Sequence, residues 1–167
     1  MNKNIERIVS EINKCLEKEL MFAALFMALS LPDLCGKEKW RELSKNNKCH
    51  ERYVKWFNKY VDYELNPLKY HFPDSDDSIS FGAEECYKLR CSLLHAGETD
   101  IGEEIDVDSF CIETSSTTFG GNLMSSGSNV VIRNGQWKNL KYINIRAITL
   151  VRAILIGVKN FLEELND

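Results

Sequence analysis

The chain has 167 residues, of which 44% are hydrophobic and 28% are charged, and its formal net charge is −4 at pH 7. These are ordinary values for a globular protein, and the length favours a single domain over residues 1–167 with a sizeable core. The net negative charge argues against a surface that is basic throughout, but it is compatible with a local basic groove that contacts nucleic acid.

The N-terminal segment predicts one long helix. Apolar residues repeat at helical spacing from Ile5 and lead into an almost wholly apolar run over 20–31. We expect Pro32 and Gly36 to end this helix. The apolar run is too short to cross a bilayer, which needs about 20 residues, so no membrane association is expected.

A second helix is expected over residues 37–61, with one apolar face and one basic face. The basic face is either a solvated surface or a track for an RNA backbone, with Trp40, Tyr53 or Trp56 stacking on bases. The RNA-binding candidates on this face are Lys45, Lys48, Arg52 and Lys55.

The rest of the chain predicts a third helix over 82–95, a β insertion at about 105–143 and a last helix over 148–162. Within the insertion, alternating segments on both sides of Asn134-Gly135 indicate a hairpin. The expected fold is therefore mainly α: a four- to five-helix up-and-down bundle with a small β-hairpin or sheet inserted before the last helix.

The six cysteines favour a reduced, cytoplasmic protein. They form no C-x-x-C pair and no secretory leader precedes them, so we expect free thiols. Neither Cys49-His50 nor the pair Cys86 and Cys91 has the ligand spacing of a zinc site. No metal ion and no cofactor are expected.

Arg90 is the residue that is hardest to explain by structure alone. On a helical wheel over 83–95 it lies near the centre of an apolar arc. A guanidinium stays charged, so it must be paired, hydrated or facing a cleft. It is either a core arginine paired with a carboxylate such as Glu11 or Glu19, or a group that binds an anion.

His95 lies in the last turn of the same expected helix, and its imidazole can transfer a proton. Arginine can hold an anionic phosphate, and histidine can take or give a proton near neutral pH. This combination suits cleavage of RNA, where the 2′-hydroxyl is an internal nucleophile and no metal is required. Arg90 and His95 are about 140° apart on an ideal helix, so they cooperate only if the last turn loosens or if two chains face each other across a two-fold axis.

The stretch R-C-S-L-L-H, from Arg90 to His95, resembles the R-x4-6-H signature of the HEPN superfamily. This resemblance implies an all-α domain that forms a homodimer and acts on RNA as a metal-independent endoribonuclease, with Arg90 and His95 as its catalytic residues. It also implies a toxin or phage-defence effector that is held in check by an antitoxin or another regulatory protein.

The residue after the arginine departs from the family's pattern. Active members usually have Asn, Asp or His there, whereas this chain has Cys91, followed by Ser92. We treat Cys91 and Ser92 as auxiliary candidates. The departure favours an alternative, a non-catalytic module of the same fold that binds RNA, a nucleotide or a protein partner through Arg90. A purely structural helical dimer is a third possibility.

Overall fold

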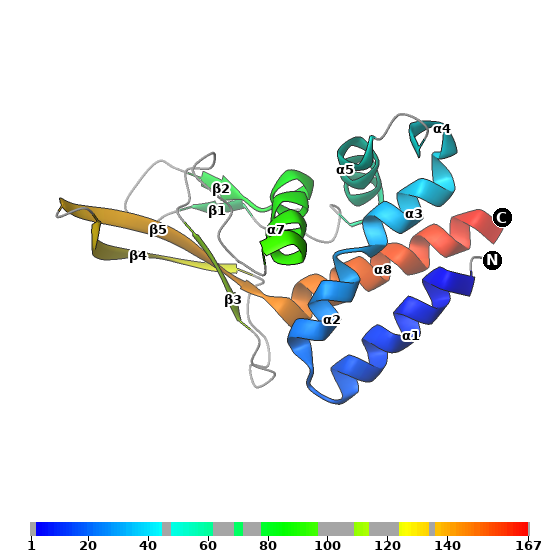
Figure 1. Cartoon of the computed structure of the whole chain (residues 1–167), viewed down its shortest axis with the longest axis horizontal. Coiled ribbons are helices and arrows are strands. Elements are labelled where there is room, and N and C mark those ends of the chain that lie inside the picture. Colours follow the sequence, from blue (N-terminus) through cyan, green and yellow to red (C-terminus); the bar gives the residue numbers. More distant parts are fainter. Residues whose placement is uncertain are drawn as a thin grey trace.

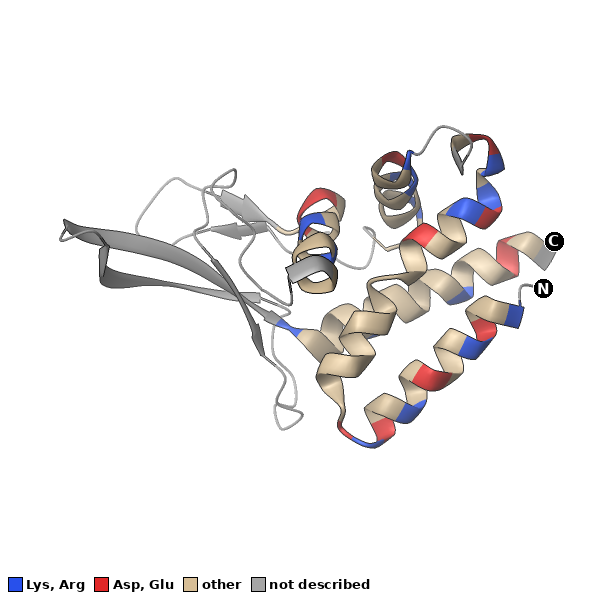
Figure 2. Ribbon diagram, in the orientation of Figure 1, with Lys and Arg blue, Asp and Glu red and all other residues tan. Residues whose placement is uncertain are grey.

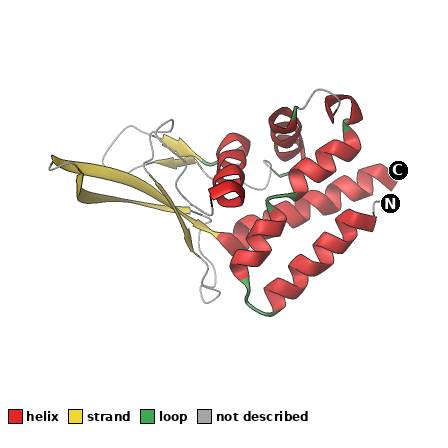
Figure 3. Cartoon of the chain, in the orientation of Figure 1, coloured by secondary structure: helices red, strands yellow, loops and turns green. Residues whose placement is uncertain are grey.

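The computed structural model describes residues 3–44, 48–61, 69–71, 78–96, 109–113, 124–133 and 136–166. The described part is mainly helical, which confirms the predicted fold class at this level (Figures 1 and 3). The helices are α1 (Lys3–Glu17), α2 (Met21–Ala28), α3 (Leu31–Lys39), α4 (Arg41–Ser44), α5 (Cys49–Tyr60), α7 (Ala83–Ala96) and α8 (Ala147–Asn166).

The prediction of one long first helix is wrong. Helix α1 ends at Glu17, and Glu19, with φ of 57°, turns the chain into α2. Pro32 does not stop a helix but lies in the first turn of α3. A proline is tolerated there because the amide hydrogens of the first turn have no partner within the helix.

The second predicted helix is also divided. Helix α3 ends at Lys39, Trp40 leaves the helical conformation with φ of −118° and ψ of 70°, and the short α4 precedes α5. Gly36 lies inside α3, where a Cβ would come within 3.0 Å of the Arg52 carbonyl oxygen. The absent side chain therefore allows α3 and α5 to pack closely, and Gly36 is not a helix stop.

Helix α8 forms the centre of the helical part and packs against α2, α3 and α5 (Figure 1). Its buried side chains recur at helical spacing, as the sequence predicts, and they include Val151, Ile154, Val158 and Phe161. On α5, Trp56 and Tyr60 form edge-to-face and tilted contacts with one another and with Phe161. This aromatic cluster fixes α5 against α8.

The strands form two small sheets. Strands β1 (Lys69–His71) and β2 (Ser78–Ser80) are antiparallel. The second sheet has the order β3-β5-β4, in which β3 (Ser109–Glu113) is parallel and β4 (Met124–Arg133) is antiparallel to β5 (Gln136–Arg146). Strand β5 runs directly into α8, so this sheet precedes the last helix at one end of the helical part (Figure 3).

Within the residues that the structure describes, no helix is both long and apolar enough to cross a membrane.

Candidate functional site on helices α5 and α7

Helix α7 occupies the position predicted for the third helix, with its start and its end shifted by a single residue. Its buried side chains are Ala83, Cys86, Leu89 and Leu93. Arg90 does not lie at the centre of this buried face but on its edge, half-buried, and the sequence prediction is corrected in this respect. Helix α7 packs against α5 and α2.

The contacts of Arg90 are with groups that carry no full negative charge. Its Nη1 donates a hydrogen bond to Cys91 Sγ at 3.7 Å, and its guanidinium carbon lies 5.7 Å from the centre of the Tyr87 ring. Its Nε is buried and has no hydrogen-bond partner among the described residues. Glu11, which the sequence offers as a partner, pairs with Lys14 instead. Arg90 therefore carries a guanidinium that is only partly satisfied.

Arg52 provides the contrast, because its guanidinium is paired with a carboxylate, although its Nε, like that of Arg90, has no hydrogen-bond partner among the described residues. It is only 6% exposed, and it donates hydrogen bonds to Asp33 Oδ1 at 2.7 Å and to the Leu43 carbonyl oxygen at 3.3 Å. This placement removes Arg52 from the predicted RNA-binding surface, since its guanidinium joins α5 to α3 and does not face solvent.

The tyrosine and cysteine side chains around Arg90 whose pKa values are raised are neutral. The Tyr53 hydroxyl and the Cys86 thiol form a buried hydrogen bond at 3.3 Å. Burial raises the pKa of the Cys86 thiol to about 12 and that of the Tyr87 hydroxyl to about 12. Burial, followed by the nearby Asp33 carboxylate, also raises the pKa of Cys49. These side chains do not neutralise Arg90 at physiological pH.

Helix α5 also brings His50 to this site, which the sequence analysis missed. His50 Nε2 lies 2.7 Å from Glu84 Oε2 in the first turn of α7, and the two side chains are about half exposed. The His50 ring is 4.7 Å from the Tyr87 ring, in an edge-on arrangement. No spacing in the sequence could reveal this pair, because His50 and Glu84 meet only when α5 packs on α7.

The other predicted site residues are placed as follows. The backbone of His95 belongs to the last turn of α7, but its side chain lies outside the described part of the structure, as does Lys45. Ser92 is half-buried on α7. The structure therefore brings Arg90 and Cys91 into contact, and the predicted geometry of Arg90 and His95 stays a prediction.

Many of the lysines on the predicted basic face are engaged within the chain. Lys48 pairs with Glu51 one turn away, and the Lys55 ammonium lies 4.6 Å from the centre of the Trp40 ring. Figure 2 shows acidic residues among the basic ones on α3, α4 and α5. These contacts favour the solvated helix face over a continuous RNA track.

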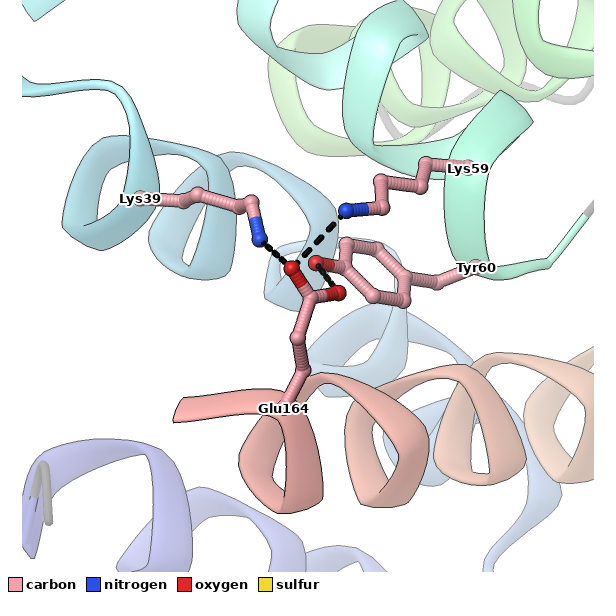
Figure 4. Close-up of polar contacts among 4 residues, drawn as sticks. All are labelled: Lys39, Lys59, Tyr60 and Glu164. Atoms are coloured by element: carbon pink, nitrogen blue, oxygen red, sulfur yellow. Dashed lines mark hydrogen bonds and ion pairs between the residues drawn. The ribbon is translucent and has the colours of Figure 1, made fainter. Parts of the chain in front are cut away.

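Two more lysines of this face converge on a single carboxylate of α8. Glu164 accepts hydrogen bonds from Lys39, from Lys59 at 2.9 Å and from the Tyr60 hydroxyl at 2.7 Å (Figure 4). These hydrogen bonds lower the pKa of Glu164 to about 2. The cluster joins the ends of α3, α5 and α8.

Comparisons with protein-family models, with curated proteins and with solved structures find no match to this chain.

Proposed function

We propose that this chain is a HEPN-like, metal-independent endoribonuclease in which Arg90 binds the scissile phosphate and His95 transfers protons. The observation that carries the proposal is the state of Arg90, a permanently charged group that is half-buried and bonded only to a thiol among the described residues. Leaving a buried donor unpaired costs about 1–3 kcal/mol, so such a group is retained more readily where a ligand completes it.

The charges around Arg90 support an anionic ligand. The Asp33 carboxylate is taken by Arg52, and the thiols of Cys49 and Cys86 are neutral. Arg52 and Arg90 together with Asp33 carry one net positive charge, and the Glu84 carboxylate is engaged with His50. A phosphodiester, which offers two oxygens in the plane of a guanidinium, is the ligand that this geometry suits best.

The proposed reaction needs no metal ion. A base removes the proton from the ribose 2′-hydroxyl, the 2′-oxygen attacks phosphorus, and the 5′-oxygen leaves and is protonated. Arg90 stabilises the charge that develops on the non-bridging oxygens. The products are a 2′,3′-cyclic phosphate and a 5′-hydroxyl end.

A homodimer is part of the proposal, because one α7 from each chain can line a shared cleft. Tyr87, Arg90 and Leu94 follow one another at helical spacing on the flank of α7, and Leu94 is 37% exposed. An apolar flank with an arginine in it suits a two-fold seam around a polar cleft. The family resemblance extends the proposal to a cytoplasmic toxin or phage-defence effector with a regulatory partner.

The test is cleavage of a mixed RNA substrate in excess EDTA by the wild type, Arg90→Ala and His95→Ala. The control variant is Arg152→Ala, since Arg152 is an exposed arginine on α8. We expect the wild type and the control to leave 2′,3′-cyclic ends, and both site variants to lose at least about 100-fold in rate. Cleavage by Arg90→Ala at the wild-type rate would refute the mechanism.

A non-catalytic module that binds RNA, a nucleotide or a protein partner is the second candidate, and the contact between Arg90 and Cys91 favours it. The thiol accepts a hydrogen bond from the guanidinium at the position where active family members have Asn, Asp or His. A thiol is a weaker acceptor than those side chains. In this case the protein binds RNA, Arg90→Ala abolishes binding, His95→Ala does not, and no cleavage is observed.

A further inference from the structure

We propose that His50, oriented by Glu84, is a catalytic base that acts with Arg90 on the RNA substrate. This inference rests on the proposed function and names a proton-transfer group for it within a single chain. It assigns a role to His50, which lies against the same Tyr87 ring as Arg90 and comes from α5 and not from α7.

The geometry brings the two groups to the same aromatic ring. The His50 ring is 4.7 Å from the Tyr87 ring, and the Arg90 guanidinium carbon is 5.7 Å from it. Tyr87 is itself held by Tyr53, whose ring is 5.2 Å away and fully buried. By these two distances (4.7 and 5.7 Å) the His50 ring centre and the Arg90 guanidinium carbon are at most about 10.4 Å apart, and we infer that the ribose and the phosphate of one nucleotide span this separation.

The hydrogen bond to Glu84 fixes which nitrogen of His50 is basic. An ionised carboxylate can only accept a hydrogen bond, so Nε2 carries the proton and donates it to Glu84 Oε2 at 2.7 Å. Nδ1 then keeps its lone pair and can accept a proton. A carboxylate that holds an imidazole in one tautomer and stabilises the imidazolium is the arrangement that serves general-base histidines in hydrolases.

The two acidic residues at the start of α7 have different tasks. Glu85 Oε2 accepts a hydrogen bond from the Gly82 amide at 2.9 Å and so caps the helix. Glu84 is turned to His50 on the neighbouring helix. A half-exposed ion pair of this kind contributes only about 0–1 kcal/mol to stability, so the fold does not require it.

The proposed step balances within the site. His50 Nδ1 takes the proton of the 2′-hydroxyl as the 2′-oxygen bonds to phosphorus. The bond from phosphorus to the 5′-oxygen breaks, the electron pair goes to that oxygen, and His95, the proton-transfer group of the proposed function, donates a proton to it. Arg90 holds the non-bridging oxygens throughout, and Glu84 acts as a positioning residue through His50.

The experiment measures RNA binding and cleavage in EDTA for the wild type, His50→Ala, Glu84→Gln and the matched control Glu11→Gln. Glu11 is a similarly exposed carboxylate paired with a cation on α1. We expect His50→Ala to bind RNA normally, to cleave at least about 100-fold more slowly and to be rescued by added imidazole. Glu84→Gln is expected to lower kcat about tenfold with KM unchanged, and Glu11→Gln to change neither.

Each outcome separates this inference from the proposed function. If Arg90→Ala is inactive but His50→Ala cleaves at the wild-type rate, the role of His50 is overturned and the endoribonuclease stands. If His50→Ala is slow but imidazole does not restore cleavage, His50 is not a proton-transfer group. If the wild type binds RNA and does not cleave it, both catalytic assignments fail and the binding module replaces them.

Discussion

The two arginines of the site respond differently to removal, and this difference tests whether Arg90 serves a ligand or the fold. Arg90→Met keeps most of the side-chain volume. It gives up a cation–π contact with Tyr87, about 0.5–1 kcal/mol, and a long hydrogen bond to Cys91. It also removes an unpaired buried Nε, whose desolvation costs about 1–3 kcal/mol. We expect the free energy of unfolding to stay within about 1 kcal/mol of the wild type or to rise.

Arg52→Met is the comparison and is expected to destabilise the fold. It leaves the Asp33 carboxylate, whose side chain is 21% exposed, without the partner at 2.7 Å, and it frees the Leu43 carbonyl oxygen. Removing one partner of a buried ion pair costs about 3–5 kcal/mol. Asp33 keeps some solvent and the buried Arg52 Nε has no described partner, so we expect the lower end of that range, about 3 kcal/mol.

Urea unfolding followed by far-UV circular dichroism measures both variants. With a slope of about 1–3 kcal/mol per M, the Arg52→Met midpoint should fall by more than about 1 M, while the Arg90→Met midpoint should not fall measurably. A loss for Arg90→Met as large as for Arg52→Met would show that Arg90 is a structural arginine. A stable Arg90→Met that binds and cleaves RNA like the wild type would instead show that Arg90 serves neither the fold nor the substrate.

Two further predictions concern the packing of α8. A Cβ at Gly157 would lie 2.7 Å from Val61 Cγ2 and 3.1 Å from the Tyr60 carbonyl oxygen. Gly157→Ala should therefore lower the free energy of unfolding in urea by about 1–3 kcal/mol, although alanine favours helices by about 1 kcal/mol, and a more stable variant would contradict this packing. Because the pKa of Glu164 is lowered from 4.5 to about 2, its contribution to stability is present at neutral pH and is lost as the pH falls from about 5 to 2. When the free energy of unfolding is measured as a function of pH, Glu164→Gln should lose less stability over this range than the wild type. Equal losses in the two proteins would mean that the hydrogen bonds to Glu164 do not form in solution.

Periodicity in the sequence was sufficient where a helix has one buried face. Helix α7 was predicted almost to the residue, and the buried positions of α8, such as Ile154 and Phe161, follow from their spacing. Each of these helices buries one face against the rest of the domain and exposes the opposite face, which is the pattern that a helical wheel detects.

Periodicity failed where a segment is apolar on all sides. Residues 20–31 read as one continuous helix because every position is compatible with burial, yet the chain turns at Glu19 and again between α2 and α3. A proline after an apolar run is consistent with the end of one helix or with the first turn of the next, and Pro32 lies in the first turn of α3. Tertiary packing determines where such a segment divides into separate helices, and the spacing of apolar residues in one sequence does not reveal that packing.

The electrostatic character of the site shows most clearly why only part of it could be predicted. Two arginines, on α5 and α7, lie within electrostatic range of one carboxylate, Asp33 on α3. The more deeply buried Arg52 forms the hydrogen bond, because leaving it unpaired would cost more than leaving the half-exposed Arg90 without a carboxylate. That an arginine on an apolar arc needs an explanation follows from the sequence. Which arginine is left without a carboxylate depends on how α3, α5 and α7 pack around Asp33, and which histidine contacts Tyr87 depends on how α5 packs on α7.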